Sequence, residues 1–447
     1  QLCEYGVVGE EEGTKPRKFL CYNLVNIVKE ASPMTTAFDK DLELIFQKLT
    51  SDRQVKQALD FLKQDAPNTI AQQKELVVIE APTFQEKQRS LHYAQMLKAA
   101  GLQDVTIDEK FNVYGKIYGS GKTGKSVLLE GHLDTVFSFG TVTDVIEKDG
   151  KLYAPGICDD TRALAANLSV IRALVNSGLR PHHDIMIAGT AAEEGLGAMS
   201  GMKYLVNNKT EEILAAISID GPSNDVMYFN ATGMINYDVT YTGPGGHAYL
   251  AFGTPSAVQA MGRAIAALSD MQVPETPKTT FTVSLANGGQ AIHGIAQSAN
   301  FKINMRSDSA EVLAQMEQQA LAIFQQGADA ENARWQKPGA VKVTFSKIMD
   351  VPAGSQSESC RMVQAAKLAT LACGITPQPR LGGCTNSNMP IAIGIPAVTL
   401  GRGGAEYGTH TVDEWFDPAG VYVCEQKSLL LLLALAGLTD VTTAPQL

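Results

Sequence analysis

The stretch Ser126-Val-Leu-Leu-Glu-Gly-His-Leu-Asp134 leads from a short apolar run directly into a histidine and a carboxylate. A short run that is apolar throughout is typical of a strand buried on both faces. Residues 184–190 and 215–220 have the same form, and residues 162–177, between the first two runs, have the spacing of a helix. Strands that alternate with helices indicate a mixed, mainly parallel sheet sandwiched by helices, so the sequence predicts an α/β fold.

The alternation changes after residue 230. The patterns there predict strands and helices in the order β-α-β-β-α-β, at residues 234–242, 255–270, 279–286, 299–306, 309–326 and 341–347. Beyond residue 352 the α/β pattern returns, with helices at 358–373 and 421–436 and a strand at 397–400. We therefore expect an α/β domain in two parts, residues 34–229 and 353–447, interrupted by an α+β domain at residues 230–352.

The N-terminal segment does not fit either domain. The first methionine is Met34, and the basic and apolar residues before it resemble a signal peptide only loosely, because Asn23 and Asn26 interrupt the apolar part. We interpret residues 1–33 as a leader outside the fold.

The composition narrows the classes of function. Of the 447 residues 45% are hydrophobic, and 37 basic against 47 acidic residues give a net charge of −10. This hydrophobic content excludes a disordered chain, and the acidic balance disfavours nucleic acid and membrane surfaces as partners. The seven cysteines are odd in number and have no Cys-x-x-Cys spacing, which favours a reducing, cytoplasmic compartment. The unusual leader leaves an exported form open.

Five polar clusters lie at or just beyond the ends of the predicted α/β strands. Together they supply two histidines and six carboxylates: His132, His410, Asp134, Asp159, Asp160, Glu193, Glu194 and Asp220. Carboxylates that converge on one edge of a sheet repel one another unless cations neutralise them. Imidazole and carboxylate ligands suit Zn²⁺, Mn²⁺ or Co²⁺, and this many ligands would suffice for two ions, so we predict a dinuclear hydrolase.

Two other chemistries are less well supported. Residues 119–126, Gly-Ser-Gly-Lys-Thr-Gly-Lys-Ser, match a phosphate-binding loop, but such a loop requires a helix directly after it, whereas an apolar strand follows here. We interpret these residues as a turn between strands. Cys384 could act as a nucleophile, but it lacks the helix and histidine context of a reactive thiol, and a small buried thiol is the more common role.

The motifs in order along the chain resemble the M20 family of zinc peptidases and deacylases. They are Leu-Leu-Glu-Gly-His132-Leu-Asp134-Thr-Val, Ala-Pro-Gly-Ile-Cys-Asp159-Asp160, Ala-Glu193-Glu194-Gly, Gly-Pro-Gly-Gly-His247-Ala-Tyr and Gly-Thr-His410. The resemblance covers essentially all of Met34 to Leu447. It implies a zinc-peptidase-like catalytic domain, with the inserted domain acting as a lid that often also forms a homodimer.

The resemblance also implies two divalent metal ions, zinc in the first place, with cobalt or manganese as alternatives. His132 and Asp220 would hold one ion, Glu194 and His410 the other, and Asp159 would bridge both.

Two catalytic roles follow from the same resemblance. Glu193 would be the general base that takes a proton from the attacking water and passes it to the leaving amine. Asp134 would orient the ring of His132. The resemblance also implies a cis peptide bond between Asp159 and Asp160.

Further residues are implied to bind the substrate or the transition state. In the lid, His247 would stabilise the oxyanion, Arg306 would grip a substrate carboxylate, and Asn287 occupies a comparable loop position. In the C-terminal part, Asn386 and Arg402 lie in loops that resemble substrate-pocket loops, whose backbone N–H groups, with Arg402, would receive an anionic group. Asn386 stands where many relatives have aspartate, which leaves the substrate preference open.

We therefore expect a metal-dependent hydrolase that cleaves an amide bond of a small peptide or an N-acyl amino acid, and we favour the peptide. An N-carbamoyl amino acid is an alternative substrate, and a catalytically silent binding protein is a second alternative. The complete set of expected metal ligands and Glu193 argue against the silent protein.

Overall fold

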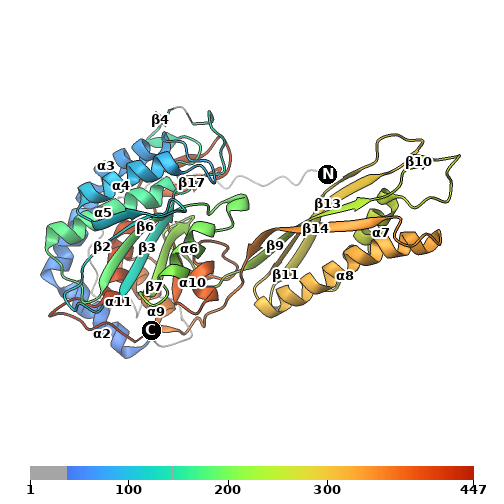
Figure 1. The fold of residues 1–447 in the computed structure, drawn as a ribbon. Helices are drawn as coiled ribbons and strands as arrows, with labels where there is room; N and C mark the ends of the chain where they lie inside the picture. The colour runs from blue at the N-terminus through green and yellow to red at the C-terminus, as the bar shows by residue number, and fades with distance from the viewer. Residues whose placement is uncertain (1–37, 143, 447) are drawn as a thin grey trace, which may run out of the picture.

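An eight-stranded mixed sheet forms the centre of the larger of two bodies in the computed structural model, which describes residues 38–142 and 144–446 (Figure 1). Its strands, in spatial order, are β1 (Gln103–Ile107), β2 (Val113–Ile117), β6 (Asp184–Thr190), β3 (Ser126–His132), β7 (Ile213–Gly221), β16 (Ala397–Gly401), β8 (Val226–Tyr228) and β15 (Gln378–Arg380). The four central strands β6, β3, β7 and β16 are parallel to their neighbours in that group, whereas β1, β2 and β8 introduce antiparallel pairs. The predicted mixed, mainly parallel sheet is confirmed.

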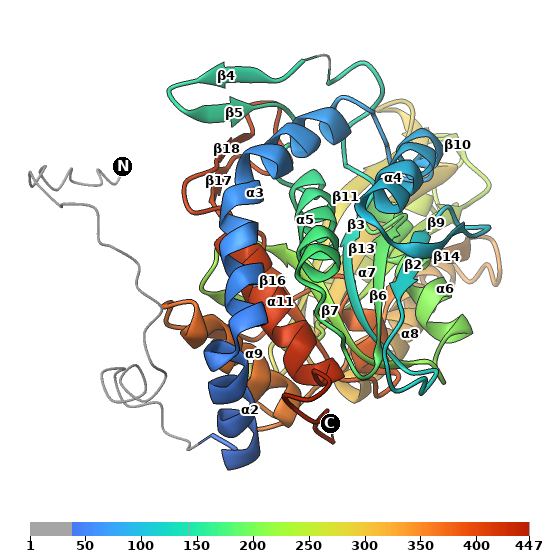
Figure 2. The ribbon, with the colours of Figure 1, turned by 90° about the vertical axis from the view of Figure 1, so that its left-hand side faces the viewer.

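Helices cover both faces of this sheet because its central strands are apolar on both sides. All seven residues of β3 are buried; Val127 and Leu129 pack into one hydrophobic cluster, and Leu128 packs into another. The first face carries α2 (Lys40–Ser51), α3 (Arg53–Val77), α4 (Lys87–Ala100), α5 (Thr161–Ser177), α9 (Arg361–Ala372) and α11 (Val423–Ala436). Figure 2 shows α3, α5 and α11 side by side over the sheet. The other face carries α6 (Ser200–Asn208) and α10 (Asn388–Ala392).

The smaller body extends away from the first and has its own core (Figure 1). It is a four-stranded antiparallel sheet in the order β11 (Thr279–Gly288), β13 (Ser298–Ser307), β9 (Gly233–Thr242), β14 (Lys342–Val351). The helices α7 (Ala257–Ser269) and α8 (Ala310–Arg334) pack against it, and β10 (Gly246–His247) pairs with β12 (Gly294–Ile295) beyond it. The strands and helices of the sheet follow the predicted β-α-β-β-α-β order.

Phe324 is the centre of the smaller core, and its loss should destabilise this body. The ring is fully buried and lies 5.6 Å from the ring of Phe301, 5.6 Å from that of Phe345 and 5.9 Å from that of Tyr237. Phe324→Ala is expected to lower the free energy of unfolding by about 3–5 kcal/mol, measured by urea denaturation. The control Tyr249→Ala removes a side chain that is 85% exposed, and it should change the free energy of unfolding by less than about 0.5 kcal/mol.

Two sequence predictions concern segments outside these cores. The predicted leader, residues 1–33, lies outside the described residues. Residues 119–125 join β2 to β3 without any helix, which contradicts a phosphate-binding loop and confirms a turn. A small sheet of β4 (Ile146–Lys148), β5 (Lys151–Tyr153), β18 (Trp415–Asp417) and β17 (Ala405–Tyr407) was not predicted. In residues 38–142 and 144–446 we find no helix with the length and apolarity needed to cross a membrane.

Candidate functional site

The predicted polar clusters meet beyond the carboxyl ends of β3, β6 and β7. His132 is the last residue of β3, Asp220 is the penultimate residue of β7, and Glu193 and Glu194 follow β6. Asp159 lies just before α5, joined to the following Asp160 by the expected cis peptide bond. His410 comes from the turn between β17 and β18. Parallel strands deliver their last residues to one edge, which explains why clusters distant in sequence share one site.

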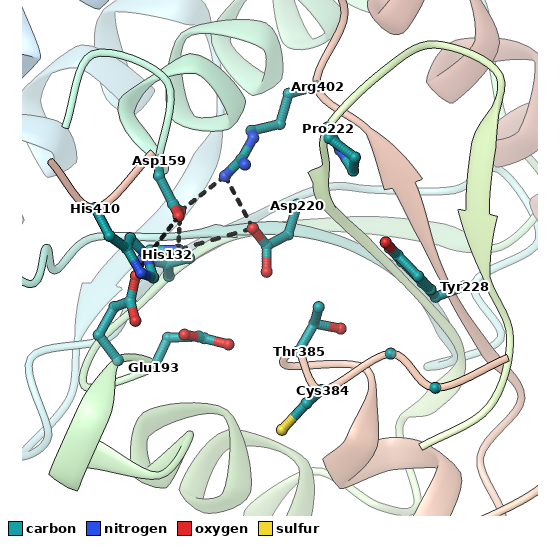
Figure 3. Close-up of a pocket in the computed structure, with 13 residues that line it drawn as sticks. His132, Asp159, Glu193, Asp220, Pro222, Tyr228, Cys384, Thr385, Arg402 and His410 are labelled. Carbon is teal, nitrogen blue, oxygen red and sulfur yellow. Dashed lines mark hydrogen bonds and ion pairs between the residues drawn. The ribbon is translucent and has the colours of Figure 1, made fainter. Parts of the chain in front are cut away.

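Asp159 occupies the centre of the cluster and faces a histidine with each of its oxygens (Figure 3). Its Oδ1 lies 2.8 Å from His132 Nε2, and its Oδ2 lies 3.1 Å from His410 Nε2. His410 Nε2 is in turn 2.8 Å from Glu194 Oε1, and His132 Nε2 is 4.0 Å from Asp220 Oδ1. The donor atoms therefore form two groups that share Asp159. This is the arrangement that a bridging carboxylate requires, although the individual ligand roles remain predictions.

The electrostatics of the cluster fit a site for cations. Burial, then the neighbouring Asp159, raise the pKa of Asp220 to about 8. Burial raises the pKa of Glu193 well above its usual range, and the carboxylates of Asp220 and Glu194 raise it further. Asp160 Oδ2 accepts the backbone N–H of His132, but its buried Oδ1 has no hydrogen-bond partner. Divalent ions would stabilise the ionised form of carboxyls that burial and neighbouring negative charges make difficult to ionise.

The donor set also indicates the kind of metal. Three combinations of side chains present ligand atoms within 4.8 Å of one another: His132, Asp159, Asp160 and Asp220; His132, Glu193 and Glu194; and Asp159, Glu194 and His410. Imidazole nitrogen with carboxylate oxygen suits Zn²⁺, Co²⁺ or Mn²⁺. The predicted metal class therefore fits the residues present.

Asp134 connects the two halves of the site. Its Oδ1 and Oδ2 accept the backbone N–H groups of Glu193 and Glu194, each at 3.0 Å, and Oδ2 also accepts the hydroxyl of Thr83 at 2.9 Å. His132 Nδ1 lies 3.1 Å from the backbone oxygen of Asp134 and 3.5 Å from its carboxylate. The residue thus contacts His132 as expected, and in addition it fixes the backbone that carries the two glutamates.

Glu414 is a functional candidate to which the sequence analysis gave no role. Its buried carboxylate accepts the backbone N–H groups of Gly156 at 2.9 Å, Cys158 at 2.8 Å and Asp159 at 3.4 Å. These bonds hold the turn that presents Asp159. The position of Glu414, four residues after His410, was the only signal in the sequence.

Glu414→Gln should weaken metal binding without removing a ligand. The glutamine amide has a similar shape but offers an N–H₂ group toward backbone donors, so the turn at Asp159 should loosen. We expect metal affinity to fall about 10- to 100-fold, measured by equilibrium dialysis. Asp413→Asn removes the same charge from the exposed adjacent position and serves as the control; equal effects of the two substitutions would contradict the role of Glu414.

Arg402 lies inside the cluster rather than at its rim. Its Nη1 is 2.8 Å from Asp159 Oδ1 and 3.0 Å from Asp220 Oδ1, and its Nε and Nη2 donate to Glu406 at 3.2 and 3.0 Å. The guanidinium therefore already contacts three carboxylates. A substrate anion, which the sequence analysis expected Arg402 to bind, would have to compete with them.

A cavity of about 250 Å³ opens over the cluster. On the side away from His410 its lining is neutral and includes Pro222, Tyr228, Cys384 and Thr385 (Figure 3). Burial raises the pKa of the Cys384 thiol to about 12, so the thiol keeps its proton at neutral pH. A protonated thiol is a poor nucleophile, which counts against the cysteine alternative.

The other predicted substrate contacts do not line this cavity. Asn386 is buried, and its amide donates to Glu130 and Thr190, so the structure does not place it where it was expected to meet substrate. His247 on β10, Asn287 on β11 and Arg306 on β13 belong to the smaller body and are exposed. Of these, Arg306 is close enough to the cavity for its charge to act on the thiol of Cys384.

Comparisons with known proteins show the family to which this sequence is similar. The sequence model of peptidase family M20/M25/M40 matches residues 128–433. Acetylornithine deacetylase of Myxococcus xanthus is 29% identical over 254 residues, 52% of this chain and 65% of that protein. Carboxypeptidase G2 of Pseudomonas sp. (strain RS-16) is 28% identical over 203 residues, 44% of this chain and 47% of that protein. The chain thus spans less than two thirds of the length of either relative.

The fold is also shared with solved structures. The crystal structure of an aminopeptidase from Bacillus cereus ATCC 10987 superposes with a TM-score of 0.69 at 19% identity, and the match covers 82% of this chain and 98% of that one. Likeness at this identity shows a common two-body fold.

Proposed function

The chain belongs to peptidase family M20/M25/M40, and from this premise we propose that it is a metal-dependent hydrolase that cleaves an amide bond of a small peptide. The observation that carries the proposal is the pair of donor groups that share Asp159, with Glu193 beside them at the cavity wall. A catalytically silent relative would have no need for a complete set of ligands together with a base.

We propose that two divalent ions bind, one with His132 and Asp220 and one with Glu194 and His410, with Asp159 shared. When bound, such ions polarise the amide carbonyl and make water a nucleophile at neutral pH. Zinc is our first expectation, with cobalt or manganese as alternatives.

Glu193 performs the proton transfers in this proposal. Its carboxylate lines the cavity, takes a proton from the attacking water, and returns the proton to the leaving nitrogen. Asp134 keeps Glu193 in place through the backbone bond described above.

The smaller body acts as the lid in this proposal. His247 and Arg306 are exposed and are not among the residues that line the cavity. His247 would reach the substrate only after the lid closes over the site, whereas Arg306 is already near enough for its charge to act on Cys384. His247 would then stabilise the oxyanion, and Arg306 would hold the carboxylate of the substrate.

We further propose that the inserted domain forms a homodimer, which light scattering on the purified protein would test.

An N-acyl amino acid is the second candidate substrate, because a deacetylase is among the similar proteins. The neutral cavity wall at Pro222, Tyr228 and Cys384 fits an uncharged substrate side chain in either case.

A substrate panel with metal control tests the proposal. Di- and tripeptides, N-acetyl and N-succinyl amino acids and N-carbamoyl amino acids are each incubated with the metal-loaded protein, and released amine or ammonia is measured. We expect peptide cleavage that stops on chelation and returns with Zn²⁺, Co²⁺ or Mn²⁺. Turnover of N-acyl substrates alone would show that the protein is a deacylase rather than a peptidase. Ammonia release from N-carbamoyl amino acids would indicate a carbamoylase. The absence of any turnover would overturn the proposal.

A further inference from the structure

Arg402 brings a fixed positive charge into a cluster that is expected to bind cations. We call the donor group of His132, Asp220 and Asp159 Oδ1 position A, and the group of Glu194, His410 and Asp159 Oδ2 position B. We propose that Arg402 makes the two metal positions unequal, so that position B binds its ion tightly and position A binds weakly. The inference rests on the proposed two-metal centre and deepens it.

The contacts of Arg402 lie on one side of the cluster. Its Nη1 donates to Asp220 Oδ1 and lies 2.8 Å from Asp159 Oδ1 (Figure 3). Asp160 Oδ1 is 3.8 Å from the same Nη1. The first two atoms are the oxygens that position A would use. At position B, by contrast, Glu194 Oε1 and Asp159 Oδ2 both face the ring of His410. Ligand oxygens that share their electron density with a guanidinium are weaker donors to a metal ion.

Arg402 has little freedom to move away. Its side chain is 4% exposed, and Glu406 accepts from both Nε and Nη2. Its backbone N–H donates to the oxygen of Gly221 at 2.8 Å, directly beside Asp220. A Cβ on Gly401 would lie 1.6 Å from the oxygen of Ser223, so the close contact between these two loops requires glycine there. The loop therefore holds the guanidinium against position A.

The charge of Arg402 cannot be removed by titration, because a guanidinium stays protonated in proteins. Of the described residues that line the cavity, it is the only lysine or arginine. A buried charge is weakly screened, so a divalent ion at position A would be repelled by Arg402 more strongly than an ion at position B. The number of ions per chain should consequently depend on the free metal concentration, with position B filling first.

Metal binding measured without any substrate tests this inference. Zn²⁺ is titrated into the metal-free protein by equilibrium dialysis against buffered free metal, and bound metal per chain is counted. We expect two steps whose dissociation constants differ by at least about tenfold. In Arg402→Met the weaker step should tighten by about tenfold or more, whereas Arg402→Lys, which keeps the charge, should retain two separated steps. Arg180→Met removes an exposed arginine that pairs with Asp440 on the surface, and it should leave both steps unchanged.

Several outcomes would overturn the inference. Two binding steps with equal dissociation constants in the unaltered protein would overturn it. So would an Arg402→Met protein that is folded by circular dichroism but binds the second ion no more tightly than the unaltered protein does. Identical behaviour of Arg402→Lys and Arg402→Met would show that shape rather than charge matters. Unequal steps in a protein that cleaves no substrate would leave the inference intact and refute the proposed hydrolase, so the two failures are distinguishable.

Discussion

Replacement of Glu193 by glutamine is expected to lower kcat by about 10²- to 10⁴-fold while both metal ions remain bound. The glutamine has nearly the same shape but cannot accept a proton from water. Glu193 belongs to the cavity lining, and its neighbour Glu194, rather than Glu193 itself, makes the 2.8 Å contact with His410. Loss of the base should therefore leave metal binding largely intact.

The matched control is Glu194→Gln, which makes the same chemical change one residue along. It is expected to lose one metal ion and activity together, because Glu194 is a predicted ligand. Metal content by atomic absorption and kcat on the best substrate are compared for both variants. Unchanged turnover in Glu193→Gln, or loss of metal equal to that in Glu194→Gln, would contradict the role of base.

Asp159→Ala should have the second large effect, because this carboxylate faces both donor groups. Its Oδ1 contacts His132 and its Oδ2 contacts His410, so its removal takes one ligand from each position. We expect both ions to bind much more weakly and turnover to fall to background at ordinary metal concentrations. Metal per chain, measured after gel filtration in metal-free buffer, should approach zero.

Single-position variants separate this effect from general damage. Asp220→Ala and His410→Ala each remove a ligand from one position only. Asp220→Ala should retain the tightly bound ion at position B, whereas His410→Ala should retain only the weaker binding at position A. Retention of a full metal content by Asp159→Ala would refute the bridging role. Loss of both ions in all three variants would instead indicate that the two positions bind cooperatively.

The strands that deliver the site could be predicted because their signal is local. Residues 126–132 and 184–190 are apolar along their whole length, and the polar residues that follow mark where each strand ends. The alternation of β9 and the long amphipathic helix α8 likewise identified the inserted sheet. Periodicity of this kind depends only on which residues face a core.

The parts that were missed depend on contacts between distant segments. Glu414 and Asp159 are 255 residues apart, so no local pattern could show that one carboxylate holds the turn of the other. The strands β5 and β18 are three residues long, too short to display a period. A motif can also place a residue in the right loop without giving the direction of its side chain. Asn386 and Arg402 both lie in loops near the site, as expected. The side chain of Asn386 nevertheless points to Glu130, and that of Arg402 points to Asp159.

The two bodies are joined where the chain leaves the larger one at Ala231 and returns at Gly354. These residues exchange both backbone hydrogen bonds, Ala231 N–H to Gly354 O at 2.9 Å and Gly354 N–H to Ala231 O at 3.0 Å. The chain that enters the smaller body and the chain that leaves it are therefore held together by this one bridge between Ala231 and Gly354. Residues 232–353 thus leave and re-enter the larger body at one place, as in a domain inserted into a host domain. The residues proposed as metal ligands and as base all lie outside residues 232–353, so a chain without the smaller body would still contain every one of them: His132, Asp159, Glu193, Glu194, Asp220 and His410.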